Sequence, residues 1–501
     1  MRLLPAALDP LLAKAKELID GSHLKARIAR GGTWLAVGSG VEEMLRLARN
    51  MILTRLIVPE AFGIVATVLA VNALMEAFTQ IGLREAIVQH PEARSRTYLN
   101  GAWWLAVTRG LLLYAAGFFL APLVAAFYEK PQIVDMLRLV FLTLIFNSAI
   151  SPRAYIMVKE MRFKLVVAIY QLGAAIGVVA AILLAVFAFA NAYTLILGFL
   201  AESLAVCVLS HIVCPFRPGF EFTREHARAL FTYVRGIFGL PILTFIFLRA
   251  DIFVLGKVVP DALLGFYSMA VHLAQMADVF IAKLLNPVLL AAFAEIQSDN
   301  GRINRLILRF TSLLALAGVP AMAFAALYGG TLLGLLYGPG YDSVAAAFAI
   351  AFVAYMLKGI ATPANNFFFG TGRPRDFRFY VAVRAAVVAA IMYPFAARWH
   401  DVGAAAAVAT ALVIAFALQI KRMHRLTGLR ARAYLSVFRV PLCASSVVAA
   451  VWALSRMWSL PPLIDLAIGG MGCAAAIAAG ALVLARRRFG PSPPPREEQG
   501  S

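Results

Sequence analysis

Three charged residues lie on one face of a helix that the sequence predicts over residues 32–56, a largely apolar segment. Glu42, Arg46 and Arg49 have i, i+4, i+7 spacing, which stacks their side chains on one side of a helix. A charge in hydrocarbon costs about 2.5–3.5 kcal/mol, so such residues face a water-filled cavity or a partner. One acid beside two arginines leaves a net positive stripe that suits an anion. The alternative is a Glu42–Arg46 ion pair that only fixes the helix to its neighbour, which would leave Arg49 unpaired.

A second set of charges lies in the apolar segment 231–256. Arg249 and Asp251 are two positions apart and therefore point to opposite sides of a helix, unless Pro241 distorts the segment. We assign Arg249 to the cavity because an internal repeat, described below, places it within one residue of Arg49.

Other embedded charges are weaker candidates. Lys358 lies about ten residues above the predicted inner end of the segment 343–368, and depth alone assigns it to the same cavity. Four acids are candidates for binding a coupling ion, either H⁺ or Na⁺: Glu42, Glu76, Asp251 and Asp278. The simpler interpretation of six embedded residues is a helix-to-helix hydrogen bond or an interfacial anchor: Glu76, Arg109, Glu202, His272, Asp278 and Lys283.

Composition places these residues in a membrane. Of the 501 residues, 62% are hydrophobic and 14% are charged, against about 45–50% apolar and about 25% charged residues in soluble domains. The apolar residues lie in a series of segments of about 20 residues, the length that crosses a bilayer as a helix. This composition excludes a soluble enzyme, a nucleic-acid-binding domain and a disordered scaffold. The four cysteines have no metal-binding spacing, and no cofactor is expected.

The sequence predicts an all-α integral membrane protein with about 14 transmembrane helices. Their predicted limits are 32–56, 61–83, 99–126, 133–157, 164–187, 190–213, 231–256, 262–287, 306–328, 343–368, 379–397, 402–421, 440–457 and 463–485. Connections on one side of the membrane carry about 32 Lys and Arg, and those on the other side carry five: Arg55, Lys130, Lys257, Arg398 and Arg456. Positive charge favours the cytoplasmic side, so both termini are predicted to be cytoplasmic.

An internal repeat links the two halves of the chain. The turn at residues 56–63 reads LIVPEAFG, and the turn at residues 258–265 reads VVPDALLG, displaced by about 201 residues. Each has Val-Pro, an acid and then Gly, which suits a helix end, a Pro at the start of the next helix and an acid at its N-terminus. Six predicted spans separate the copies, so the halves have the same orientation, an arrangement that places a substrate site between two lobes.

These observations divide the chain into six parts. They are a cytoplasmic or interfacial N-terminal segment (1–30), a six-helix N-terminal lobe (31–214), a cytoplasmic linker (215–230), a six-helix C-terminal lobe (231–424), two extra transmembrane helices (425–486) and a disordered cytoplasmic tail (487–501). The two lobes are related by a parallel pseudo-two-fold repeat. The outer connections are too short to form an extracytoplasmic domain.

The residues from 33 to 89 resemble the opening of the Wzx-type polysaccharide and oligosaccharide flippases, a family of the multidrug/oligosaccharidyl-lipid/polysaccharide exporter superfamily. The residues that carry the resemblance are Arg55, Pro59, Glu60, Phe62, Gly63, Gly82, Leu83 and the run Ala86 to Gln89. The resemblance implies a bacterial inner-membrane protein with two lobes that carries undecaprenyl-pyrophosphate-linked glycan to the outer leaflet.

If the resemblance holds, the embedded charges acquire roles. Arginine suits a pyrophosphate because its planar fork binds phosphate through two hydrogen bonds and stays charged when partly desolvated. Arg46, Arg49, Arg249 and Lys358 would form the substrate-binding site, with Glu42 as the partner of Arg46. Asn365 and Asn366 lie near the inner end of their span, where polar groups could receive sugars. The expected partners are the lipid-linked glycan, the bilayer and a polysaccharide polymerase or ligase, and no nucleic acid.

Three other functions share part of this pattern. A related multidrug antiporter would usually have twelve spans and an acidic cavity, whereas the embedded charge here leans basic. The related lipid II flippase also has fourteen spans, but the opening motif looks more like the polysaccharide branch. A membrane polymerase or O-antigen ligase would need a sizeable extracytoplasmic loop.

Overall fold

The computed structural model describes residues 24–77, 87–88, 90, 93–160, 162–220, 240–297, 299–458 and 460–489. These residues form α-helices and one 3₁₀ turn, and no β-strand occurs among them. Outside them lie most of the predicted segment 1–30, of the linker 215–230 and of the tail 487–501, together with the motif residues Gly82, Leu83, Ala86 and Gln89. The first described helix begins at Leu24, so the helical part of the N-terminal lobe starts before residue 31.

Helices of the N-terminal half match the six predicted spans. They are α2 (Leu24–Leu56), α3 (Pro59–Ala77), α5 (Arg96–Tyr128), α6 (Ile133–Ser148), α7 (Arg153–Lys159), α8 (Phe163–Phe187) and α9 (Ala192–Val213). The predicted span 133–157 is bent rather than straight, because α6 and α7 meet at an angle of 58°. Pro152 lies at the bend, where a proline disfavours helical backbone at the residue before it.

The C-terminal half also consists of helices. They are α11 (Leu240–Val258), α12 (Asp261–Glu295), α13 (Asn300–Tyr337), the 3₁₀ turn η1 (Tyr341–Val344), α14 (Ala345–Ile360), α15 (Thr362–Gly370), α16 (Pro374–Thr427), α17 (Ala431–Ser436), α18 (Arg439–Ser455) and α19 (Pro462–Phe489). Helix α16 contains two predicted spans, and its backbone leaves helical geometry at Trp399 and His400. This break lies where the sequence predicts an outer connection.

Ten of the described helices are long and apolar enough to cross a membrane, or eleven if the bent pair α6–α7 counts as one span. Helices α2 and α11, which hold the charged residues Arg49 and Arg249, are not among the ten. Helix α16, which contains two of the predicted spans, is counted as one of the ten. The protein is therefore an all-α multi-pass membrane protein, and the number of fourteen crossings stays a prediction.

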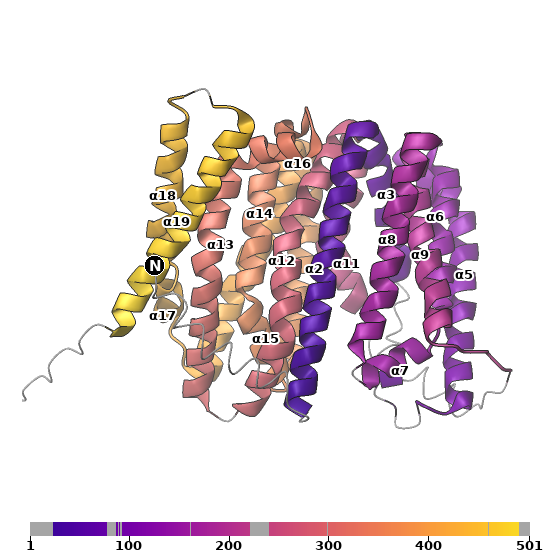
Figure 1. Ribbon diagram of the computed structural model, residues 1–501, viewed down its shortest axis with the longest axis horizontal. Coiled ribbons are helices and arrows are strands. Elements are labelled where there is room, and N and C mark those ends of the chain that lie inside the picture. The colour runs from indigo at the N-terminus through magenta and orange to yellow at the C-terminus, as the bar shows by residue number, and fades with distance from the viewer. Residues whose placement is uncertain are drawn as a thin grey trace, which may run out of the picture.

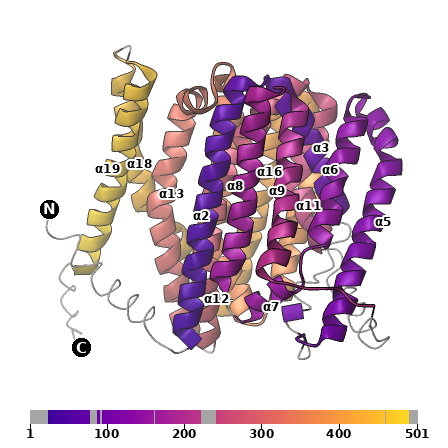
Figure 2. The ribbon, with the colours of Figure 1, turned by 45° about the vertical axis from the view of Figure 1, so that its right-hand side comes forward.

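The helices stand side by side in one layered bundle (Figures 1 and 2). Helix α5 lies at one end, and α18 and α19 lie at the other, where they pack on α13. Helix α2 packs on both α8 and α12, while α3 packs on α11 and α12. Helices α2 and α3 of the first half therefore form the contact with the second half.

The two copies of the repeated turn touch each other. A Cβ atom on Gly63 would lie 1.9 Å from the carbonyl oxygen of Asp261, and one on Gly265 would lie 2.0 Å from that of Pro59. Only glycine permits such an approach of two backbones. The prediction of a proline and an acid at each helix start is confirmed, since α3 begins at Pro59 and α12 begins directly after Pro260.

Two ion pairs lie beside this contact and also join the halves. Lys130 Nζ is 2.5 Å from Asp261 Oδ1 and donates to the carbonyl oxygen of Gly256 at 2.8 Å. Lys257 Nζ is 2.6 Å from Glu129 Oε1. We call the two glycines and these two ion pairs the outer contact, because the charge distribution predicts that this end of the helices faces outward.

Candidate functional site

Arg46 on α2 is held by two carboxylates. Its Nη2 lies 3.1 Å from Glu42 Oε1, one helical turn away, and 2.6 Å from Glu202 Oε1 on α9. The three side chains are 22%, 24% and 14% exposed, respectively, so the group is largely screened from water. The sequence indicated Glu42 as the partner, but Glu202 was interpreted only as a helix-to-helix anchor. Two carboxylates hold Arg46, which therefore fixes α2 to α9, and together they carry one negative charge more than the arginine neutralises.

Arg49, three residues further along α2, has no such partner. Its Nε and Nη2 both donate to Asn50 Oδ1 at 3.2 Å, and no carboxylate lies within ion-pair distance among the described residues. The amide oxygen is a neutral acceptor, and the negative charge that acts on Arg49 is that of Glu202, which is bonded to Arg46. Arg49 thus has the unpaired guanidinium that the helical spacing indicated.

Arg249 and Asp251 on α11 have different surroundings, as their spacing predicts. Asp251 is 2% exposed and accepts hydrogen bonds from the Ile252 backbone N–H at 2.8 Å and from Tyr267 Oη at 2.9 Å. Arg249 is exposed, and it makes no ion pair in the part of the chain that the structure describes. Asp251 is therefore buried inside the C-terminal half, whereas the Arg249 side chain is exposed.

His272 on α12 connects these arginines. Arg46, Arg49 and Arg249 all lie close enough to act electrostatically on its ring. Its Nε2 is buried and has no hydrogen-bond partner among the described residues. We call Arg46, Arg49, Arg249 and His272 the arginine cluster. Its members come from α2 in the first half and from α11 and α12 in the second, so it lies between the two halves.

Lys358 on α14 belongs to a different set of contacts. Its Nζ lies 2.5 Å from Asp278 Oδ2 on α12, and Asp278 is 5% exposed. The expectation that Lys358 joins the arginines is not met in this geometry, because α14 presents it to the acid of a neighbouring helix. Its depth along the helix could not reveal that partner.

The Lys358–Asp278 pair lies at the edge of a cavity of about 580 Å³. We call it the amide cavity, because Asn286, Asn365 and Asn366 line it together with Thr362, Phe369 and Phe377. The lining residues come from α12, α14, α15 and the start of α16, so the cavity lies within the C-terminal half. Asn365 and Asn366 both line this cavity, and the expectation that they receive sugars stays a prediction.

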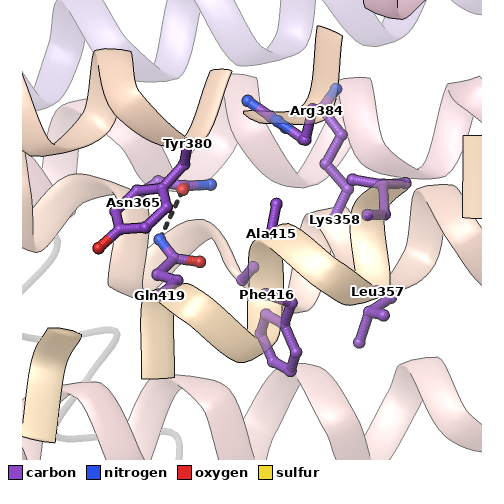
Figure 3. A pocket seen from close by; sticks show the side chains of 10 residues that line it. Leu357, Lys358, Asn365, Tyr380, Arg384, Ala415, Phe416 and Gln419 are labelled. Atoms are coloured by element: carbon purple, nitrogen blue, oxygen red, sulfur yellow. Dashed lines mark hydrogen bonds between the residues drawn. The ribbon is translucent and has the colours of Figure 1, made fainter. Parts of the chain in front are cut away.

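A narrow pocket adjoins the amide cavity and shares Lys358 and Asn365 with it (Figure 3). Its free space of about 20 Å³ holds a water molecule at most. Figure 3 shows Arg384 of α16 beside Lys358, and Gln419 bonded to Asn365 next to Tyr380. Arg384 is an embedded charge of the predicted span 379–397, so the rule that selects Arg49 applies to it equally.

Each candidate coupling acid already has a partner. Asp251 bonds to Tyr267, Asp278 pairs with Lys358, and Glu76 on α3 lies within electrostatic reach of Arg109 on α5. No group of three or more His, Cys, Asp or Glu residues in the described ranges could hold a metal ion. A sodium ion at any of these acids would compete with the existing partner.

Comparisons with known proteins bear on this arrangement. The model of a family described as "Polysaccharide biosynthesis protein" matches residues 52–346. The chain is 21% identical over 352 residues to the lipopolysaccharide biosynthesis protein WzxC of Escherichia coli, covering 70% of this chain and 71% of that protein. It is 23% identical over 342 residues to the succinoglycan biosynthesis transport protein ExoT of Rhizobium meliloti, covering 68% of each.

Solved structures share the fold. The lipid II flippase MurJ in an inward closed conformation has a TM-score of 0.74 at 13% identity, covering 91% of this chain and 99% of that one. An inward-facing multidrug transporter of the MATE family has a TM-score of 0.58 at 15% identity, covering 78% and 96%. At these identities the likeness establishes the fold alone.

Proposed function

Because this chain belongs to the polysaccharide biosynthesis protein family, we propose that it is a flippase for lipid-linked glycan in a bacterial inner membrane. It moves an undecaprenyl-pyrophosphate-linked glycan from the cytoplasmic to the outer leaflet. The chain is a multi-pass membrane protein, and its role is transport rather than catalysis.

The observation that carries this proposal is the arginine cluster between the two halves. Arg49 from α2 and Arg249 from α11 form no ion pair among the described residues, and the charges of both act on His272. A pyrophosphate is an anion that cannot cross hydrocarbon unaided. Two guanidinium groups that approach it from different lobes give it charge-assisted hydrogen bonds in place of water. The polyprenyl tail stays in the lipid.

Transport then follows from movement of the lobes, residues 31–214 and 231–424, around this site. The outer contact holds the lobes together at the predicted outer end through Gly63, Gly265 and two ion pairs. Separation of this contact would open the cluster to the outer leaflet, while closure at the inner end would exclude the cytoplasm. A polymerase or ligase would receive the glycan after release.

The likeness to MurJ and MATE proteins supports two other candidates, a lipid II flippase and a cation antiporter. An antiporter for cations needs unpaired acids in its cavity, since an unpaired arginine repels its substrate. The acids around this site all have partners: Glu42, Glu43, Glu202, Asp251 and Asp278. This charge pattern favours an anionic substrate. A lipid II flippase would also fit this charge pattern, because its substrate is anionic too. The lipid-linked intermediate that accumulates without the protein distinguishes the two kinds of flippase.

Deletion of the gene tests the function. Membranes of the deleted cells should accumulate a lipid-linked polysaccharide repeat, identified by mass spectrometry, and restored expression should remove it. Accumulation of lipid II would support the other flippase candidate. Accumulation of no lipid-linked glycan, together with new sensitivity to cationic drugs, would contradict the proposal.

The proposed orientation has its own test. In a variant whose four free cysteines are replaced by alanine, Asp401→Cys should react with a membrane-impermeant maleimide from the periplasm, and Arg425→Cys should not. Asp401 follows the break in α16, and Arg425 lies in its last turn, which the charge count places in the cytoplasm with both termini. Labelling of Arg425→Cys from the periplasm would contradict the fourteen-span topology.

A further inference from the structure

Asn50 of α2 makes a contact to which the proposed function assigns no role. Its side chain is 3% exposed, and its Oδ1 accepts hydrogen bonds from both Nε and Nη2 of Arg49 at 3.2 Å. Two N–H groups on one edge of a planar guanidinium that bond to the same oxygen fix the orientation of the plane. A buried acceptor therefore holds the arginine to which we assign the pyrophosphate.

The partner of Arg49 is neutral, whereas the partners of Arg46 on the same helix are charged. Arg46 Nη2 lies 3.1 Å from Glu42 Oε1 and 2.6 Å from Glu202 Oε1. An aspartate at position 50 would have nearly the same shape as Asn50, and a carboxylate binds a guanidinium more strongly than an amide does. It would also cancel the charge of Arg49. The amide at position 50 thus gives a weaker bond and preserves the positive charge.

The hydrogen bonds to Asn50 leave the other edge of the guanidinium available. A guanidinium carries five N–H donors, and these bonds engage one donor on Nε and one on Nη2. The Nη1 atom of Arg49 makes no hydrogen bond to other described residues. Nη1 and Nη2 together form a pair of donors that can bind two oxygens of one phosphate. The edge that Asn50 does not hold is therefore the edge that suits the substrate.

Other charges near Arg49 do not take the place of a ligand. Arg46 and Glu202 act on its guanidinium with opposite signs, and Glu202 is itself 2.6 Å from Arg46. No carboxylate lies within ion-pair distance of Arg49 among the described residues. A bound anion is then the first negative group to contact this guanidinium directly.

We propose that Asn50 is a positioning residue for the pyrophosphate site. Its amide oxygen holds one edge of Arg49 and leaves the other edge for a phosphate, and its lack of charge preserves the positive charge of Arg49 for the anion. Asn50 acts through Arg49 and need not contact the substrate. This inference rests on the proposed flippase function and adds the residue that keeps its anion site open.

Undecaprenyl pyrophosphate and undecaprenol, both radiolabelled, are the probes. They share the polyprenyl chain and differ in the charged group, so the ratio of their affinities measures the contribution of the pyrophosphate. Binding is measured on the full-length protein in lipid nanodiscs, and stability is measured by thermal unfolding in detergent. The wild-type protein should bind the pyrophosphate at least about tenfold more tightly, the effect of one hydrogen bond to a charged group.

Asn50→Asp should separate affinity from stability. The new carboxylate pairs with Arg49 and repels the anion, so undecaprenyl pyrophosphate should bind at least about tenfold more weakly, while undecaprenol binds as before. The melting temperature should equal or exceed that of the wild type, because a carboxylate bonds the guanidinium more strongly. A residue that only stabilises the fold would not lower affinity while stability is kept. Unchanged affinity, or loss of the folded protein, would contradict the inference.

Two neutral substitutions test how Asn50 holds Arg49. Asn50→Ala removes the acceptor and should weaken binding of undecaprenyl pyrophosphate about three- to tenfold, less than the loss in Asn50→Asp. Asn50→Gln keeps an amide oxygen and should recover part of that loss. If Asn50→Ala binds as weakly as Asn50→Asp, the absence of charge at position 50 has no role and the inference is wrong.

Asn72→Asp is the matched control. Asn72 of α3 is 4% exposed, and its Nδ2 donates to Thr143 Oγ1, a neutral group, at 3.4 Å. The same substitution there buries an acid that Arg49 does not neutralise, so it should lower the melting temperature and change neither affinity. Equal loss of stability in Asn50→Asp and Asn72→Asp would show that Arg49 does not pair with an acid at position 50.

Arg49→Ala separates this inference from the proposed function. If the wild-type protein prefers the pyrophosphate and Arg49→Ala loses that preference, but Asn50→Asp keeps it, the inference is wrong while the function stands. If the wild-type protein binds both lipids equally, the pyrophosphate site fails, and the proposed function fails with it.

Discussion

Helices α2 and α11 begin the two halves of the repeat, yet they use their charges differently. Each presents an arginine without a carboxylate partner, Arg49 in α2 and Arg249 in α11. On α2 the acid Glu42 lies beside Arg46 and, with Glu202, fixes the helix to α9. On α11 the acid Asp251 turns away and bonds to Tyr267. The arginines common to both halves thus lack an ion-pair partner among the described residues, whereas the acids bond to side chains of neighbouring helices or of their own helix.

Loss of Arg49 should produce the largest effect. Arg49→Ala should abolish flipping, by a factor of at least about 100, because it removes a charged ligand from a desolvated anion. Arg49→Lys should retain part of the activity, since the charge remains while the two-pronged fork is lost. The measurement is the amount of accumulated lipid-linked glycan at equal expression. Normal transport by Arg49→Ala would show that this arginine does not bind the pyrophosphate.

The equivalent position in the second half should give the next largest effect. Arg249→Ala should slow flipping about tenfold without changing the thermal stability, because its side chain is exposed and has no partner among the described residues to lose. Asp251→Ala should instead cost about 1–3 kcal/mol of stability, because it leaves the buried hydroxyl of Tyr267 without its acceptor. Thermal unfolding in detergent separates the two. If both variants lower the melting temperature equally, Arg249 and Asp251 do not differ in their contribution to stability, and the expected contrast is wrong.

The acid on α9 should affect stability more than transport. Glu202→Gln removes one of the two charges on Arg46 and should lower stability by about 1 kcal/mol, since the pair is only partly buried. Flipping should stay within about twofold of the wild type when measured at equal protein levels. A loss of transport as large as that of Arg49→Ala would show that Glu202 acts in transport itself and does not only hold Arg46.

The outer contact should give the smallest effect, and it depends on pH. The hydrogen bond from Lys257 and its charge lower the pKa of Glu129 below its ordinary value of 4.5. Because the pKa of Glu129 is lower in the folded state, the ion pair stabilises the protein at any pH above the ordinary pKa. This stabilisation is lost as the pH falls through the lowered pKa of the folded state. The melting temperatures of wild type and Glu129→Gln should therefore differ slightly at pH 7 and converge below pH 4. A constant difference would show that this pair contributes no charge interaction.

Charge and spacing within one helix predicted much of this site. The face shared by Glu42 and Arg46, the unpaired Arg49 and the opposite settings of Arg249 and Asp251 all follow from helical geometry. The repeat also predicted two equivalent helix starts. These features are local in sequence, so no knowledge of the packing was needed.

Partners from distant helices could not be predicted in this way. Glu202 is 156 residues from Arg46, and Asp278 is 80 residues from Lys358. One apolar helix gives no sign of which neighbour faces it, so depth alone could not reveal that Lys358 pairs with Asp278. Arg384 could have been found as an embedded charge, but the pocket that it shares with Gln419 depends on how α14 and α16 pack.

The backbone contact between Gly63 and Gly265 also has a mechanical consequence. The backbones of the two helix starts meet without a side chain of Gly63 or Gly265 between them, so no side chain at these two positions hinders their separation. A methyl group at either position would meet a carbonyl oxygen about 2 Å away and act as a wedge between the lobes. Gly63→Ala or Gly265→Ala therefore offers a way to trap the molecule open toward the outside for structure determination.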